Sequence, residues 1–292
     1  MTDLAQAVVL GLLIGGTYAL VGCGLSLIYG VMGIINFAHG ALLILAAFLT
    51  YTIWQATGLD PLLALVVTTP LMFGLGWALY SVLIRPVREE FVGASVLLPF
   101  GLALLVEASM GTIWGNNTKS IRPSYVDDSY HVGGLFLPKV QLFGVGLAVL
   151  LLVALVAFLR HTWTGRAIRA ASANPRGAEL VGVDVGGVSA MTFALGVAAT
   201  AAGGSIVGVL FSFVPGSGTQ WLVRLLAIVV LGGMGSIGGT VIAGLVLGVA
   251  ESLTSRYVGL VWTTAVPYVV VFLVLLARPH GLLGARLRED VA

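Results

Sequence analysis

The chain has 292 residues, of which 59% are hydrophobic and 9% are charged, and its formal net charge is +2. Soluble domains carry about 25% charged residues, so this composition excludes an ordinary soluble protein and indicates a polytopic membrane protein. The small net charge gives no sign of a nucleic-acid partner, because the basic residues gather in loops and not along one face.

Eight apolar runs are each long enough to cross a bilayer, which takes about 20 helical residues. Backbone groups in lipid must hydrogen-bond internally, and the period-2 alternation of barrel strands is absent, so the runs predict helices. The first run lacks the basic segment of a cleaved signal peptide and is expected to remain as a helix. The predicted fold is an all-α bundle of about eight transmembrane helices, forming one domain over residues 1–292. In chain order the runs cover 4–29, 34–56, 62–84, 93–114, 140–159, 187–213, 220–250 and 258–277.

The first polar interruption follows the first run, in the segment Ile34-Ile-Asn-Phe-Ala-His-Gly40. Asn36 and His39 could line a solute path or form a gate, where they would offer hydrogen bonds to a zwitterionic solute. They could instead bond a helix end to a neighbouring helix, because buried polar groups are generally paired. Both interpretations stay open, and Asn36, His39 and Gly40 are candidate path residues.

Glu107 lies within the fourth run, where a carboxylate is costly and is expected to have a role. It is either the partner of an arginine such as Arg224 or a proton site. Intramembrane acids commonly pair, so we expect the structural pair. Glu251 is expected at the membrane interface, since Arg256 follows it closely.

A charged island, TGRAIRAASANPRGAELVGVDV, occupies 164–185 between two apolar runs. Its first part suits a short helix lying along the membrane, and Asn174-Pro175 marks a break before a second short helix. Most of the arginines lie in three segments, which are the loop at 85–90, the loop at 160–186 and the tail at 278–288. The positive-inside rule therefore predicts a cytoplasmic position for all three segments. The ordered pattern of the island favours a docking surface for a soluble partner over a loop without contacts.

If the chain crossed the membrane three times after the cytoplasmic island, its basic tail would lie outside. That position conflicts with the positive-inside rule. The conflict disappears if the run 220–250 is interrupted at Gly232-Gly-Met-Gly-Ser-Ile-Gly-Gly239, a stretch that sustains a helix poorly. We therefore predict a break near 232–239 that makes two crossings or a re-entrant pair. Non-helical backbone at that depth is tolerated only where it is buried or lines a wet cavity, which indicates a translocation path. The candidate path residues here are Gly232, Gly233, Gly235 and Gly239.

The sequence contains no P-loop, no H-E-x-x-H motif, no cysteine pair and no G-x-S-x-G elbow. Neither lysine follows a glycine, so the chain cannot be its own P-loop ATPase. The four scattered histidines do not form a metal site. We therefore expect no catalytic residue, no metal and no cofactor bound by this chain.

The island at 165–183 resembles the cytoplasmic coupling loop of branched-chain amino acid ABC transporter permeases, and also that of ribose-type sugar permeases. Further segments narrow the resemblance to the LivH-type subunit. They are Gly15-Gly-Thr-Tyr-Ala-Leu20, the stretch LIYGVMGIINFAHG at 27–40, VVLGGMGSIGG at 229–239 and RPHGLLG at 278–284.

The resemblance implies a five-part importer in the bacterial inner membrane, with this chain as a non-catalytic subunit. A second, LivM-like permease would pair with it, and two cytoplasmic ABC ATPases carrying ATP and Mg²⁺ would dock on the coupling loops. An external binding protein would deliver the solute. The loop 160–186 and the C-terminus would be cytoplasmic. The coupling element would comprise Gly165, Arg166, Arg169, Asn174, Pro175, Glu179 and Gly182.

The family also includes permeases for urea and short amides, whose N-terminal motif is much the same. Branched-chain amino acids are the expected substrate class, and urea or a short amide is the alternative. A secondary transporter coupled to ions through Glu107 is a less favoured interpretation. A scaffold without a solute path fits poorly with the predicted break and the ordered island.

Overall fold

The computed structural model describes residues 2–86, 94–278 and 281–283, so parts of the predicted 85–90 loop and basic tail lie outside the described residues. Within these ranges, eight helices are long and apolar enough to cross a membrane. The all-α membrane fold is therefore confirmed. The spanning elements are α1 (Thr2–Met32), α2 (His39–Thr57), α3 (Pro61–Leu79) with a π-helical turn η1 (Tyr80–Ile84), α5 (Ala94–Trp114), α6 (Lys139–His161), α9 (Val185–Leu210), α11 (Ile237–Tyr257) and α12 (Val266–Ala277), which the 3₁₀ helix η3 (Leu260–Ala265) precedes.

Shorter elements complete the bundle. Two short helices, α7 (Trp163–Ala173) and α8 (Pro175–Leu180), connect α6 to α9, and a 3₁₀ turn η2 (Pro215–Ser217) leads into α10 (Gly218–Gly232). Between α5 and α6, strands β1 (Ser129–Val132) and β2 (Leu135–Pro138) form an antiparallel hairpin in which Ser129 faces Pro138.

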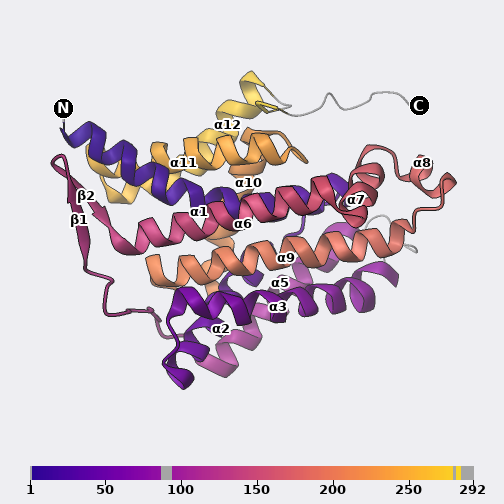
Figure 1. Ribbon diagram of the computed structural model, residues 1–292, viewed down its shortest axis with the longest axis horizontal. Coiled ribbons are helices and arrows are strands. Elements are labelled where there is room, and N and C mark those ends of the chain that lie inside the picture. The colour runs from indigo at the N-terminus through magenta and orange to yellow at the C-terminus, as the bar shows by residue number, and fades with distance from the viewer. Residues whose placement is uncertain (1, 87–93, 279–280, 284–292) are drawn as a thin grey trace.

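The long helices run between two opposite ends of the molecule (Figure 1). One end, which we call the hairpin end, holds the N-terminus and the β1–β2 hairpin. The other, which we call the α7 end, holds α7 and α8. The last described residues also reach the α7 end, because the amides of Leu282 and Leu283 donate to the carbonyls of Leu231 and Gly232 at the end of α10.

Glycines allow α1 and α11 to pack closely in an antiparallel pair. A Cβ at Gly11 would lie 2.6 Å from Cα of Val249, and one at Gly248 would lie 2.6 Å from Cα of Gly15. Small residues at this spacing let two helix backbones approach each other in lipid. The small-xxx-small pairs of these helices therefore serve packing within the chain.

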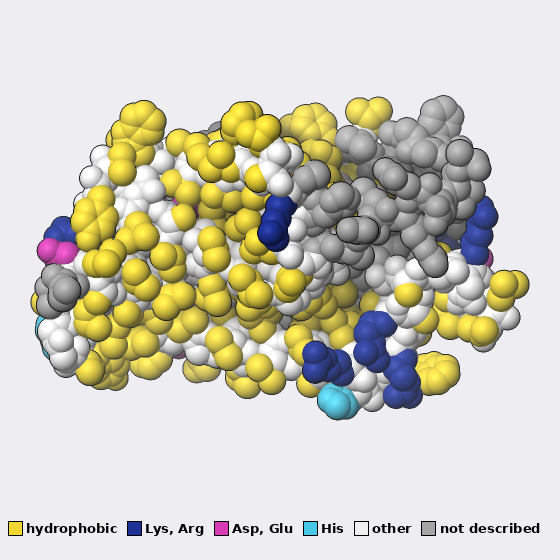
Figure 2. Space-filling model, turned by 90° about the horizontal axis from the view of Figure 1, so that it is seen from above, with side chains coloured by type: hydrophobic (Ala, Val, Ile, Leu, Met, Phe, Trp, Pro, Cys, Tyr) yellow, Lys and Arg dark blue, Asp and Glu magenta, His cyan; other side chains and the backbone are white. Residues whose placement is uncertain are grey.

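Helix α9 is the most enclosed span, with 83% of its apolar window buried against its neighbours. By contrast, the windows of α5, α6 and α12 are 17%, 22% and 6% buried. Their outward apolar side chains are the surface that lipid or another membrane subunit would cover. Figure 2 shows one such face, on which hydrophobic side chains predominate.

The predicted break in the run 220–250 is confirmed. Helix α10 ends at Gly232 and α11 begins at Ile237, and Gly233 and Gly235 between them have positive φ angles of 94° and 82°. α10 has 15 residues and is about 22 Å long, which is shorter than a bilayer core of roughly 30 Å. Its first residue, Gly218, lies inside the bundle against Gly40 and Ala41 of α2.

Two predicted boundaries were wrong. The second helix begins at His39 instead of residue 34, and α11 continues to Tyr257, beyond the predicted end at residue 250. His39 starts its helix within the protein because its ring is enclosed by α1 and α9, which are distant in sequence. Hydropathy in the sequence does not record that contact.

Candidate functional site

Side-chain caps at the N-terminal ends of α7 and α8 determine the shape of the predicted coupling element. The Thr162 hydroxyl accepts from the Gly165 amide at 3.0 Å, and the Asn174 side chain accepts from the Gly177 amide at 3.0 Å. Pro175 is the first residue of α8, where the missing amide hydrogen costs nothing. The predicted pair of short helices with a break at Asn174-Pro175 is confirmed.

Two predicted glycines of this element occupy positions where the backbone geometry leaves no room for a Cβ atom or disfavours one. A Cβ at Gly165 would collide with the backbone of Leu159, so glycine lets α7 turn tightly off the end of α6. Gly182 has a φ of +86°, a conformation that side chains with a Cβ rarely adopt. Gly165 and Gly182 therefore determine the backbone path of the element.

The charged residues of the element face outward. Arg166, Arg169 and Glu179 are exposed, and the Arg166 guanidinium lies 5.3 Å from the ring centre of Trp163. An Nη atom of Arg169 lies 3.5 Å from the carbonyl oxygen of Arg160. Figure 2 shows most of the Lys and Arg side chains on its face toward the α7 end.

Three exposed apolar side chains on this element escaped the sequence analysis. Leu180 is 89% exposed, Val181 is 78% exposed and Trp163 is 75% exposed. Tryptophan is enriched among the residues that contribute most to protein interfaces, so Trp163 is the strongest candidate contact of the three. The signal in the sequence was the pair Leu180-Val181 at the end of the second short helix, away from any long apolar run.

The first group of predicted path residues is buried. His39 Nε2 lies 2.5 Å from the Thr200 hydroxyl and 3.4 Å from the Val21 carbonyl. Asn36 Oδ1 accepts from the Ala38 amide at 3.1 Å, and Gly40 packs on Gly218. These contacts join α1, α2, α9 and α10, and a role in the path stays a prediction. Within the described residues, Asn36 Nδ2 and His39 Nδ1 are buried without hydrogen-bond partners.

The second predicted group forms the turn between α10 and α11. Gly232 and Gly239 pack backbone to backbone across this turn. Gly235 lies against Gly30, where a Cβ would be 3.2 Å from the Gly30 Cα. The glycine-rich stretches at 30–35 and 232–237 therefore meet at the α7 end.

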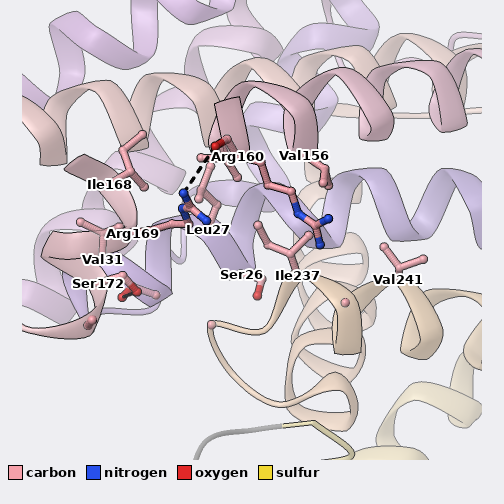
Figure 3. Close-up of a pocket in the computed structure, with 15 residues that line it drawn as sticks. Ser26, Leu27, Val31, Val156, Arg160, Ile168, Arg169, Ser172, Ile237 and Val241 are labelled. Carbon is pink, nitrogen blue, oxygen red and sulfur yellow. Dashed lines mark hydrogen bonds between the residues drawn. The ribbon is translucent and has the colours of Figure 1, made fainter. Parts of the chain in front are cut away.

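A cavity of about 630 Å³ links the two predicted sites. Its walls include Gly30 of α1, Gly235 of the break, and Ser172 of α7, whose hydroxyl donates to the Gly30 carbonyl at 2.6 Å. Figure 3 shows Arg160 and Arg169 reaching into this cavity from α6 and α7. The coupling element thus directly contacts α1 at the point where α1 meets the break.

The expected pairing of Glu107 with Arg224 is wrong. Arg224 pairs with Glu251, with 2.9 Å between Nε and Oε1. Glu107 is half-buried on α5 and lines a smaller cavity of about 530 Å³ beside Pro215 and Asn116.

Glu251 is enclosed by its neighbouring helices, and its interfacial position stays a prediction. The residue is 8% exposed, and its Oε2 accepts a hydrogen bond from the Tyr18 hydroxyl at 2.7 Å. Arg256, which suggested that position, instead pairs with Asp3, with 2.9 Å between Nη2 and Oδ1. Sequence spacing missed both partners because each pair joins helices that meet only in the folded bundle. The described residues contain no cluster of three or more His, Cys, Asp or Glu side chains suited to a metal ion.

Comparison with known proteins decides the family. Residues 7–277 match the family model described as "Branched-chain amino acid transport system / permease component". The chain belongs to this family. It is similar to the high-affinity branched-chain amino acid transport system permease proteins LivH of Salmonella typhimurium, 31% identical over 94% of this chain and 93% of the relative, and BraD of Pseudomonas aeruginosa, 30% identical over 96% and 95%. LivH of Escherichia coli K12 is 30% identical over 94% and 93%. No solved structure matches the chain.

Membership of the permease family agrees with the architecture. The match extends from α1 to the last residue of α12, so it includes the coupling element and the break between α10 and α11. The protein is a multi-pass membrane permease. The family assignment also agrees with the resemblance found in the motifs at 27–40, 165–183 and 229–239.

Proposed function

We propose that this permease is one membrane subunit of an ATP-driven importer that carries branched-chain amino acids delivered by an external binding protein. The observation that carries the proposal is the capped, exposed α7–α8 element on a member of this permease family. This element offers a soluble partner an ordered binding surface. The surface has exposed charges at Arg166 and Arg169 and exposed apolar groups at Leu180 and Val181.

The partners follow from this arrangement. Two cytoplasmic ATPases dock on the coupling elements of this chain and of a second, LivM-like permease, and they hold the ATP and Mg²⁺. The positive-inside rule supports a cytoplasmic α7 end, because the arginines of 160–176 lie there. The contact of Leu282 and Leu283 with α10 supports a cytoplasmic C-terminus as well. The hairpin end then faces the binding protein.

Contacts of Ser172 and Gly30 support a route for the mechanical signal. Closure of the ATPases on ATP displaces α7, and α7 is bonded through the Ser172 hydroxyl to the carbonyl of Gly30. Gly30 touches Gly235 at the turn between α10 and α11. Movement of α7 thereby displaces the two glycine-rich turns, which can shift because they carry few side chains. The bundle then changes between its outward-open and inward-open states.

Uptake of labelled leucine by cells with and without this chain tests the function. Deletion is expected to remove most uptake, and the restored gene is expected to recover it. Unchanged leucine uptake with lost urea or amide uptake would transfer the proposal to the alternative substrate class. Uptake that survives ATP depletion but fails with an ionophore would replace the ATP-driven mechanism by an ion-coupled one.

A further inference from the structure

The cavity beside α7 has apolar walls and a cationic rim. Its volume of about 630 Å³ lies within the range of roughly 300–1,000 Å³ that small-molecule sites occupy. Leu27 of α1, Val156 of α6 and Val241 of α11 supply apolar wall. Arg160 and Arg169 reach into it from α6 and α7 (Figure 3). We call it the α7-end cavity.

The length of α6 places the cationic rim at the boundary of the bilayer. With 23 residues α6 is about 34 Å long, so it spans a hydrocarbon core of roughly 30 Å from end to end. Arg160 is the next-to-last residue of α6 and therefore lies at the level of the lipid headgroups. Val156 lies one turn earlier, about 6 Å deeper and at the level of the acyl chains. The cavity thus extends from the polar layer of the membrane into its apolar layer.

Exposed apolar side chains flank the cavity on both sides. Val153, one turn before Val156, is 61% exposed. Ile242, one turn after Gly238 of the cavity wall, is 45% exposed. Such apolar surface on a membrane-spanning bundle is a place for lipid or another membrane subunit. A lipid chain can therefore reach the cavity from the bilayer, between α6 and α11.

The positive charge of the rim is unbalanced. No Asp or Glu is among the described residues that line the cavity. The Arg160 guanidinium makes no hydrogen bond or ion pair within the described part of the chain. Arg169 contacts a neutral group, the Arg160 carbonyl, at 3.5 Å. Two neighbouring arginines without a counter-charge, at the edge of a membrane, favour an anionic ligand such as a phosphate group.

We propose that the α7-end cavity binds an anionic phospholipid. Arg160 and Arg169 hold the phosphate, and one acyl chain lies against Leu27, Val156 and Val241. A free phosphate ion would use the rim alone and leave the apolar walls without a ligand. A phospholipid matches both parts of the cavity, in the order in which the bilayer presents headgroup and chain.

This inference goes beyond the proposed function and rests on one part of it, the cytoplasmic α7 end. The cytoplasmic leaflet is the one that is rich in anionic lipids. Arg160 and Arg169 lie on either side of the turn at Thr162, so a shared phosphate would hold α6 and α7 together. Ser172 and Gly30 belong to the same cavity wall, so the lipid would stabilise the contact that connects α7 to α1.

Photoreactive phosphatidylglycerol, with a diazirine in its acyl chain, tests the inference. The probe is added to the purified permease–ATPase complex in phosphatidylcholine nanodiscs, and the labelled peptides are located by mass spectrometry. Labels are expected on the apolar walls around Val156 and Val241. Unlabelled phosphatidylglycerol is expected to compete. Phosphatidylcholine carries no net charge and glycerol 3-phosphate has no acyl chain, so neither is expected to compete.

Substitutions of Arg160 test the rim. Arg160→Gln is expected to lower the labelling of these walls about fivefold, the effect of losing one basic residue near an anionic headgroup. Arg160→Lys should keep most of the labelling, because a lysine also binds phosphate as a point charge. A role of Arg160 in folding alone would not give this dependence on charge. Arg122→Gln, an exposed arginine outside the cavity, is the matched control and should be labelled like the wild type.

A substitution at Gly238 tests the apolar part. A Cβ at Gly238 meets nothing within 4 Å, so Gly238→Leu is expected to fold and to extend its side chain into the space of the acyl chain. Labelling by the lipid should fall several-fold while the arginines are unchanged. Gly146→Leu, on α6 where a Cβ also meets nothing within 4 Å, should be labelled like the wild type.

Three results would overturn the lipid site. They are equal labelling of the walls by photoreactive phosphatidylcholine, undiminished labelling of both Arg160→Gln and Gly238→Leu, and capture of another subunit by a photoreactive residue in place of Val156. The last would assign the cavity to a protein contact. Labelling needs no transport, so a failure of leucine uptake would leave the lipid site in place. A failure of labelling would leave the proposed function in place.

Discussion

At the scale of single residues, Ser172 makes a hydrogen bond between α7 and α1. Its hydroxyl donates to the carbonyl of Gly30, the residue that touches the break at Gly235. We expect Ser172→Ala to reduce transport several-fold while the ATPase still co-purifies, because the docking surface stays but the contact that passes its movement is lost. Paired measurements of leucine uptake and ATPase recovery check this. Ser109→Ala, on exposed α5, is the control, and equal uptake by both variants would contradict the role.

Gly235 offers a second test at the same scale. Its φ of +82° and its approach to Gly30 leave no relaxed conformation for a β-branched residue. We expect Gly235→Val to lower leucine uptake strongly, since strain of at least about 1–2 kcal/mol falls on the turn between α10 and α11. Gly146→Val, on α6 where a Cβ meets nothing within 4 Å, should transport normally. Undiminished uptake by Gly235→Val would remove the break from the mechanism.

At the scale of elements, α7 and α8 carry the proposed ATPase contact. We expect Arg166→Glu combined with Arg169→Glu to leave the bundle folded, because both side chains are exposed, and to abolish recovery of the ATPase. Pull-down of the tagged permease measures this, and rising salt should weaken the wild-type contact too. Arg122→Glu, exposed in the segment between α5 and β1, is the charge-matched control. Normal recovery of the double variant would place docking elsewhere.

The elements also show which features the sequence could predict. Apolar runs located every spanning helix, and charge parity located the break at 232–239, because both depend on local composition and on the bilayer. The start of α2 at His39 and the pairing of Arg224 with Glu251 could not be found in this way. Each depends on which helices become neighbours, and the partners of His39 on α1 and α9 are 18 and 161 residues away. The two short helices α7 and α8 were predicted correctly because their pattern is contained in one short segment.

At the scale of the whole molecule, the source of energy distinguishes the remaining mechanisms. An ion-coupled transporter needs a titratable group in its path, and Glu107 was the sequence candidate for it. The structure leaves Glu107 half-buried on α5, whereas the coupling element is connected to the break by way of Gly30 on α1. We therefore expect leucine uptake to stop when ATP is depleted at constant membrane potential, and to continue with an ionophore while ATP is held constant. We also expect Glu107→Gln to keep most of the ATP-driven uptake. Loss of uptake in Glu107→Gln together with sensitivity to the ionophore would assign the energy coupling to α5 instead of α7.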